Sequence, residues 1–218
     1  MRKTTGKIFI YAVLQMIAVT VLIVGTDVLA APAWRGDTRT TFEQWSFTEQ
    51  DSDPQPPDTD PHWVNEYGTP LLSVFGSEWN NTVDGHQGVW TFMGFGSGVL
   101  ADIPNNDKAL PEKEIWVELT WKAAGISNFI PDKPNVDVWA NHKEVELIHE
   151  NQIDGGAWWS SLYIIHIWPN PSAEQITING DIYLDQVVID TYCGIPEPGI
   201  MSLLGLGAVL GLRRKRHV

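Results

Sequence analysis

The chain has 218 residues, of which 14 are basic and 27 acidic, so its formal net charge at pH 7 is −13. Such an acidic chain repels phosphate backbones, which disfavours nucleic-acid binding. A single cysteine, Cys193, excludes an internal disulfide, so the fold must be stabilised by core packing. A passive thiol and an intermolecular link are both open readings of Cys193.

The first 30 residues have the layout of a secretory signal peptide. Three basic residues precede an apolar run over residues 8–25, and small residues follow it. We expect cleavage after Ala30 or after Ala33. Because the apolar run is long, an uncleaved anchor is the alternative. In either case the positive-inside rule places the basic end in the cytoplasm and the following chain outside, which predicts an exported protein.

The middle of the chain is long enough for one domain with a real core, which we place at residues 34–193. Residues 31–195 carry 7 basic and 25 acidic side chains, a net charge of −18. The domain opens with a loose linker over residues 34–37, and residues 76–88 are polar and rich in turn formers.

Short runs of alternating apolar and polar residues recur along this domain. The clearest covers residues 114–122, where Ile115, Val117 and Leu119 alternate with mostly polar residues, as in a half-buried antiparallel strand. No segment between the two ends has a sustained 3.6-residue period. The pattern predicts an all-β protein, an antiparallel, jelly-roll-like β-sandwich. The predicted strands are residues 40–48, 70–75, 88–93, 98–103, 114–122, 135–140, 143–149, 157–168, 174–179 and 181–191.

Two pairs of these strands are expected to form hairpins. Residues 135–140 and 143–149 flank Asn141-His142, and residues 174–179 and 181–191 flank Asn179-Gly180, a favoured tight-turn pair. The last of these strands resembles the closing strand of jelly rolls of the carbohydrate-binding-module type.

Residues 50–61 contain four prolines, which are incompatible with regular structure. Four aspartates in this loop offer the hard oxygen ligands that Ca²⁺ prefers. The loop lacks the turn glycine and the closing glutamate of an EF-hand, so a solvated acidic loop is the alternative. Calcium is the only cofactor that the sequence suggests, and its candidate ligands are Asp51, Asp53, Asp58 and Asp60.

No catalytic constellation can be assembled from the sequence. It contains neither the G-x-S-x-G motif of serine hydrolases nor the H-E-x-x-H motif of zinc proteases, and we expect His142 and His149 on the surface. Glu144 and Glu146 share a predicted strand face about 7 Å apart, a separation that a glycosidase could use. Alternating acidic residues on a solvent-facing strand explain the same pattern. The protein is therefore predicted not to be an enzyme.

Eleven tryptophans are a high number for a chain of this length, and most of them must lie in the core. Sugar-binding proteins place exposed indoles against the CH-rich faces of pyranose rings, next to polar groups that bond the hydroxyls. Trp116 lies on the polar face of its strand, which makes it a candidate. Core packing is the alternative for each candidate. The candidates are Trp116, Trp139, Trp158 and Trp159, with Glu118, Asp137 and Asn141 as polar neighbours.

The last 24 residues contain three features in a fixed order. Pro196, Glu197 and Pro198 come first, followed by an apolar run over residues 199–212. As a helix this run would reach about 21 Å, less than the ~30 Å hydrocarbon core of a bilayer. Snorkelling of the basic side chains that follow can extend this reach, so the run predicts a marginal membrane anchor. The basic side chains are Arg213, Arg214, Lys215 and Arg216.

This tail, residues 195–218, resembles the PEP-CTERM sorting signal of exported proteins in bacteria that make exopolysaccharide. In that family the membrane enzyme exosortase recognises the motif and processes the tail. The resemblance implies that exosortase is a partner and that the protein reaches the cell envelope or extracellular matrix after transient membrane attachment. A plain C-terminal anchor and a last apolar helix of the domain are the alternatives.

Together these features lead us to expect an exported, exosortase-sorted protein whose body binds or organises extracellular polysaccharide. An extracellular glycoside hydrolase or lyase is the alternative of another class. A structural matrix protein without a ligand is the third.

Overall fold

The structure is a computed structural model that describes residues 31–48, 50, 54–58, 65–93, 96–105, 110–125 and 133–194. The predicted signal peptide and the predicted sorting signal, with its motif, apolar run and basic cluster, lie outside these residues. Within the described ranges, no helix has the length and apolar character needed to cross a membrane.

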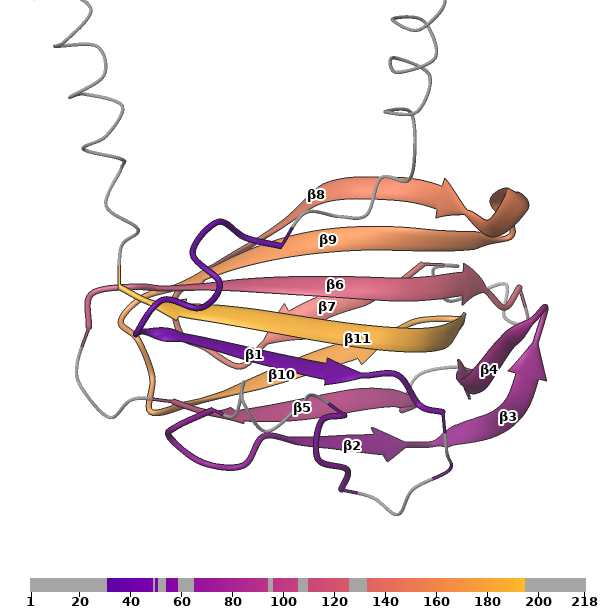
Figure 1. The fold of residues 1–218 in the computed structure, drawn as a ribbon, viewed down its shortest axis with the longest axis horizontal. Coiled ribbons are helices and arrows are strands. Elements are labelled where there is room, and N and C mark those ends of the chain that lie inside the picture. Colours follow the sequence, from indigo (N-terminus) through magenta and orange to yellow (C-terminus); the bar gives the residue numbers. More distant parts are fainter. Residues whose placement is uncertain are drawn as a thin grey trace, which may run out of the picture. The chain divides into compact units, whose positions relative to one another are not determined.

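The described residues form eleven strands in two antiparallel sheets that pack face to face, which confirms the predicted all-β, antiparallel sandwich (Figure 1). A short 3₁₀ turn, Asp154–Gly156, joins two of the strands. The smaller sheet has the order β2 (Leu71–Phe75), β5 (Gly98–Pro104), β10 (Ala173–Asn179) and β7 (Asn135–Val138). The larger sheet has the order β3 (Ser77–Val83), β4 (His86–Phe92), β11 (Ile182–Cys193), β6 (Lys113–Ala123), β9 (Trp158–Ile167) and β8 (Lys143–Ile153), and β1 (Thr40–Trp45) pairs with β11.

Strand β11 is central to the larger sheet. One of its edges pairs with β6 along its whole length. The other edge is shared, because β4 pairs with Ile182–Leu184 and β1 with Val187–Tyr192. The register against β6 shifts between Leu184 and Gln186, which is the irregularity expected of a β-bulge. The shift lies between the part of β11 that pairs with β4 and the part that pairs with β1.

The core lies between the two sheets and consists of the inward-facing residues of each strand. In β6 the residues Ile115, Val117 and Leu119 are fully buried, as their alternation predicted. They share the core with Val99 and Ile176 of the smaller sheet. Burying one such side chain stabilises the folded state by about 1.5–3 kcal/mol. The apolar residues of each two-residue period therefore face the interior.

Both predicted hairpins are wrong. Strand β7 belongs to the smaller sheet and β8 to the larger one, and β10 and β11 are divided in the same way. Gly180 has φ 151°, and a Cβ on it would lie 2.7 Å from the Lys133 carbonyl oxygen. The Asn179-Gly180 pair therefore permits a close backbone approach where the chain crosses between the sheets. A two-residue period indicates an inward face but does not indicate which sheet a strand joins.

The hairpin of β3 and β4 was missed in the sequence, which predicted a turn-rich connection there. Every residue of β3 is at least partly exposed, so the strand has no apolar alternation. Its tip is Asp84-Gly85, and both residues have positive φ, 49° and 93°. That is the conformation of a type I′ turn, for which Asp-Gly is a favoured pair. The Asp84-Gly85 pair was the sequence signal that could have revealed this hairpin.

Residues 32–39, which we call the strap, pack against the outer face of the larger sheet. The predicted loose linker is part of it, and that prediction is wrong. Arg35 donates two hydrogen bonds of 2.5 Å to the carboxylate of Asp190 in β11, and its guanidinium lies 4.1 Å from the centre of the Phe42 ring. The Arg35 amide donates to the Pro32 carbonyl oxygen at 2.9 Å, which closes a turn.

Candidate functional site

Two of the four predicted tryptophans are covered by other side chains. Trp158 is 1% exposed, and the His86 ring stacks on it with centroids 3.9 Å apart. Its ring therefore offers no free face to a ligand, contrary to the prediction. Trp159 is partly buried against the core, and its ring stacks with that of Trp121 at 6.1 Å. Core packing accounts for Trp159, and the His86 ring covers Trp158, which is not part of the core cluster.

Trp116 lies on the outer face of β6, half-buried, beside the strap. The ring of Trp34 meets it edge-on, with centroids 5.9 Å apart and an angle of 78° between the planes. The indole N–H of Trp116 donates to Glu114 Oε1 at 2.5 Å. The predicted placement on the polar face is confirmed by the burial pattern, but part of the ring is covered by the chain itself.

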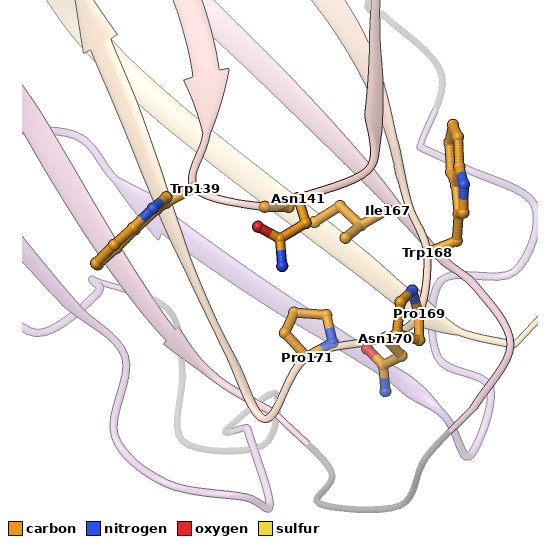
Figure 2. Close-up of a pocket in the computed structure, with 8 residues that line it drawn as sticks. Trp139, Asn141, Ile167, Trp168, Pro169, Asn170 and Pro171 are labelled. Carbon is orange, nitrogen blue, oxygen red and sulfur yellow. The ribbon is translucent and has the colours of Figure 1, made fainter.

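Trp139 is 82% exposed and borders a groove of about 420 Å³ (Figure 2). Trp168, which the sequence reading did not single out, is 41% exposed and lies on the opposite side of the same groove. The side-chain amide of Asn141 lies between the two indoles. The groove is lined by Trp139, Ala140, Asn141, Ile167, Trp168, Pro169, Asn170 and Pro171.

The groove forms where the chain crosses twice between the sheets. Residues 139–142 lead from β7 in the smaller sheet to β8 in the larger, and residues 168–172 lead back from β9 to β10. The Trp168 amide donates to the His142 carbonyl oxygen at 3.2 Å, which ties the two crossings together. The Trp139 amide donates to the Gln175 carbonyl oxygen at 2.9 Å. Backbone bonds thus position both indoles.

The groove combines apolar rings with neutral amides. No acidic or basic side chain is among its lining residues. The His142 ring lies nearly parallel to the Trp168 ring, with centroids 6.5 Å apart and a 10° angle between the planes. Flat apolar surfaces beside amide donors and acceptors can stack on a sugar ring and bond its hydroxyls.

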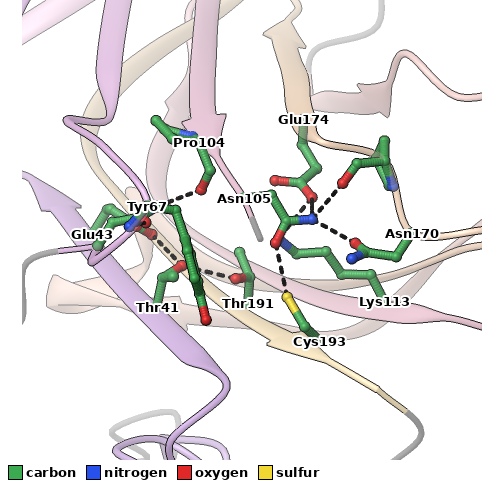
Figure 3. A network of polar contacts seen from close by, with 12 residues as sticks. Thr41, Glu43, Tyr67, Pro104, Asn105, Lys113, Asn170, Glu174, Thr191 and Cys193 are labelled. Atoms are coloured by element: carbon green, nitrogen blue, oxygen red, sulfur yellow. Dashed lines mark hydrogen bonds and ion pairs between the residues drawn. The ribbon is translucent and has the colours of Figure 1, made fainter. Parts of the chain in front are cut away.

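Asn105, directly after β5, holds the 168–172 crossing from the interior (Figure 3). Its side-chain amide donates to Asn170 Oδ1 at 2.5 Å and to the Pro171 carbonyl oxygen at 2.6 Å. Its backbone N–H donates to the Ser172 carbonyl oxygen at 3.2 Å. Asn170 and Pro171 both line the groove, so Asn105 supports the groove without lining it.

A buried polar network surrounds Asn105. Lys113 and Glu174 form an ion pair of 2.7 Å in which both side chains are fully buried, and Asn105 donates to Glu174 Oε1 at 2.8 Å. Burial raises the pKa of Glu174, and the positive charge of Lys113 acts in the opposite direction. Cys193 Sγ lies 2.9 Å from Asn105 Oδ1 and the residue is 1% exposed, so the folded domain does not present this thiol to another molecule.

The three predicted polar neighbours lie in different places. Asn141 lies in the groove. Asp137 pairs with the Lys143 ammonium and accepts the Val138 N–H at 2.8 Å. Glu118 lies on the outer face of the larger sheet, where burial raises its pKa to about 7 despite the nearby charge of Arg35. The structure therefore brings only Asn141 together with a predicted tryptophan in the groove.

Of the four predicted calcium ligands, only Asp58 lies in the described residues. Its carboxylate accepts the Ser46 N–H at 2.6 Å, and its own N–H donates to the Gln44 carbonyl oxygen at 2.7 Å. These bonds hold Asp58 against the end of β1. In the described ranges, no three His, Cys, Asp or Glu side chains come together as a metal site. Calcium binding by Asp51, Asp53 and Asp60 stays a prediction.

The candidate glycosidase carboxylates are exposed on the edge strand of the larger sheet. Glu144 is opposite His166 and Glu146 is opposite Ile164 in β9. Neither is among the residues that line the groove. His142 is exposed beside the groove, and His149 Nε2 lies 2.5 Å from the Asn151 amide.

No family model, curated protein or solved structure matches the chain.

Proposed function

We propose that this is an exported, exosortase-sorted envelope protein whose sandwich binds polysaccharide in the groove between Trp139 and Trp168. The observation that carries the proposal is the pair of exposed indoles on opposite sides of one groove, with the Asn141 amide between them. An isolated exposed tryptophan is common on protein surfaces. Two that border one hollow beside a neutral amide match the chemistry of a sugar, which has apolar ring faces and hydroxyl edges.

The fold that we propose is a jelly-roll variant. Among consecutive strands only β3 and β4, and β8 and β9, follow each other within one sheet, and every other connection crosses between the sheets. Such alternation supports an arrangement of interleaved Greek keys. The sorting proposal is supported by the tail sequence, whose motif, apolar run and basic cluster follow one another in the expected order.

The proposal favours binding over catalysis because no carboxylate lines the groove. A glycosidase needs two carboxyl groups about 5–9.5 Å apart on either side of the scissile bond. Glu144 and Glu146 share one solvent-exposed strand face instead.

The test measures binding of a panel of oligosaccharides to the full chain purified in detergent. Tryptophan fluorescence is the readout. Trp139→Ala should weaken binding at least about tenfold, because it removes one stacking surface. Phe75→Ala is the matched control, since Phe75 is an aromatic residue that is 40% exposed in β2 and does not line the groove. Equal loss in both variants, or binding that survives Trp139→Ala unchanged, would contradict the proposal. Absence of binding to every glycan would favour the structural matrix protein.

A further inference from the structure

We infer that the groove selects neutral glycan chains over acidic ones, and that it binds at least two sugar rings of one chain. This inference rests on the proposed function, because it names the class of ligand for the same groove. It is carried by the chemistry of the lining and by the charges around it.

The residues that line the groove include no basic side chain. A uronate or sulfate group is recognised in proteins mainly by arginine or lysine, which pair with its charge. The polar side chains that line the groove are Asn141, which is exposed, and Asn170, which is 8% exposed and accepts the Asn105 hydrogen bond, and both are neutral amides. An amide both donates and accepts hydrogen bonds, which matches a hydroxyl and leaves a carboxylate without a counter-charge.

The lysine nearest in sequence to the groove residues is already paired. Lys143 follows the 139–142 crossing, and its ammonium contacts the Asp137 carboxylate and donates to the Val138 carbonyl oxygen at 2.6 Å. An acidic sugar would have to compete with both partners. Residues 31–195 also carry a net charge of −18, which repels a polyanion at low ionic strength.

The two indoles indicate more than one sugar ring. Trp139 and Trp168 border the groove from opposite sides, and each exposes part of its ring. One pyranose can stack on one indole, so a monosaccharide uses half of the available aromatic surface. A chain that reaches both indoles gains the second contact as an intramolecular event, and its affinity should exceed that of a monosaccharide by about tenfold or more.

The experiment measures dissociation constants for the full chain in detergent, at 20 and 300 mM NaCl. The probes are neutral glucose, mannose and xylose oligomers of one to six sugars, and hexamers of guluronate, mannuronate and galacturonate. We expect a neutral hexamer to bind at least about tenfold more tightly than its monosaccharide. We also expect it to bind at least about tenfold more tightly than each uronate hexamer at both salt concentrations, because high salt removes only the long-range repulsion.

The outcomes separate this inference from the proposed function. Uronate hexamers that bind as tightly as neutral ones, and lose binding in Trp139→Ala, would overturn the inference and support the proposed function. No binding by any glycan would overturn both. Equal affinity for monosaccharide and hexamer would overturn the two-ring part.

A charge variant gives an independent readout. Asn141→Lys places a cation between the two indoles, and Asn141 is exposed, so the fold should tolerate the change. We expect this variant to gain at least about fivefold in uronate affinity, since a lysine ammonium can pair with the carboxylate. Asn141→Gln, which keeps the neutral amide, should not. An equal response of the two variants would show that charge in the groove does not set the selectivity.

Discussion

Glu43 is a buried acidic side chain that accepts hydrogen bonds from Thr41 and Asn65. It lies on the inward face of β1 beside Trp45 and is 1% exposed. Burial raises its pKa to about 8, and hydrogen bonds from Thr41 and Asn65 together with the charge of Lys113 only partly oppose that effect. At neutral pH Glu43 is therefore mostly protonated, because a neutral carboxyl group is less costly to bury than a carboxylate.

This pKa makes the stability of the domain depend on pH. The pKa of Glu43 is about 8 when folded and about 4.5 in its ordinary state, so the folded chain holds an extra proton between these values. The free energy of unfolding should fall as the pH rises through this window, by at most about 1.4 kcal/mol per unit, and level off above it. Glu43→Gln removes this contribution. Between pH 5 and pH 8 the variant should lose roughly 2–4 kcal/mol less stability than the parent.

Urea unfolding at pH 5, 6.5 and 8 measures this difference. The slope that persists in Glu43→Gln belongs to the other carboxyl groups whose pKa burial raises, Glu118, Glu174, Asp185 and Asp190. Glu144→Gln is the control, because Glu144 is exposed on the edge strand and the substitution should leave the pH profile unchanged. If the free energy of unfolding of Glu43→Gln and of the parent fell in parallel with pH, the raised pKa of Glu43 would be contradicted.

Among the elements, the strap ties the chain before β1 to the outer face of the larger sheet. It covers part of Trp116 with Trp34 and pairs Arg35 with Asp190, whose side chain is 3% exposed. Burial raises the pKa of Asp190, and the Arg35 hydrogen bonds and charge act against that rise. Both predicted cleavage positions, after Ala30 and after Ala33, leave Trp34 and Arg35 in the mature chain. Processing at either position would therefore keep this contact.

Removing the strap's cation should destabilise the domain. Arg35→Gln leaves the Asp190 carboxylate buried without its partner, and we expect a loss of about 2–4 kcal/mol in the free energy of unfolding at pH 7. Asp190→Asn in the same chain removes the buried charge and should restore at least half of that loss. Urea unfolding of the single and double variants measures both effects. A double variant as unstable as Arg35→Gln would show that packing of the strap matters more than the charge.

At the scale of the whole molecule, the described domain ends next to the proposed sorting signal. The last strand, β11, ends at Cys193, and the proposed motif begins at Pro196. The motif follows the last strand of the sandwich, so changes to it should affect sorting and leave folding intact.

Replacing Pro196 and Pro198 with alanine tests the sorting proposal. We expect the domain to fold normally and the full-length chain to accumulate in the membrane fraction, because exosortase would no longer recognise the motif. Cell fractionation with intact-mass measurement shows whether the tail has been processed. Thermal unfolding shows whether the domain is folded. The control replaces Pro56 and Pro57, two prolines outside the motif, and should be processed normally. Normal processing of the Pro196/Pro198 variant would contradict the sorting proposal.

The sequence by itself determined the all-β class and most of the strands, because alternation with a period of two reports which side chains face the interior. Ile115, Val117 and Leu119 are the clearest case. It missed β3, whose residues are all partly exposed, since a strand without a buried face has no such period. It also could not reveal that Glu43 and Lys113 are buried, because partners such as Glu174 come from distant parts of the chain.

Only the tertiary structure decided which sheet each strand joins and which tryptophans face solvent. The same alternation fits a strand of either sheet, so β7 with β8 and β10 with β11 looked like hairpins although each pair is divided between the sheets. The candidate groove depends on those crossings. Trp139 and Trp168 are far apart in the sequence. They border one groove only because residues 139–142 and 168–172 both cross between the sheets there, joined by the bond from Trp168 to His142.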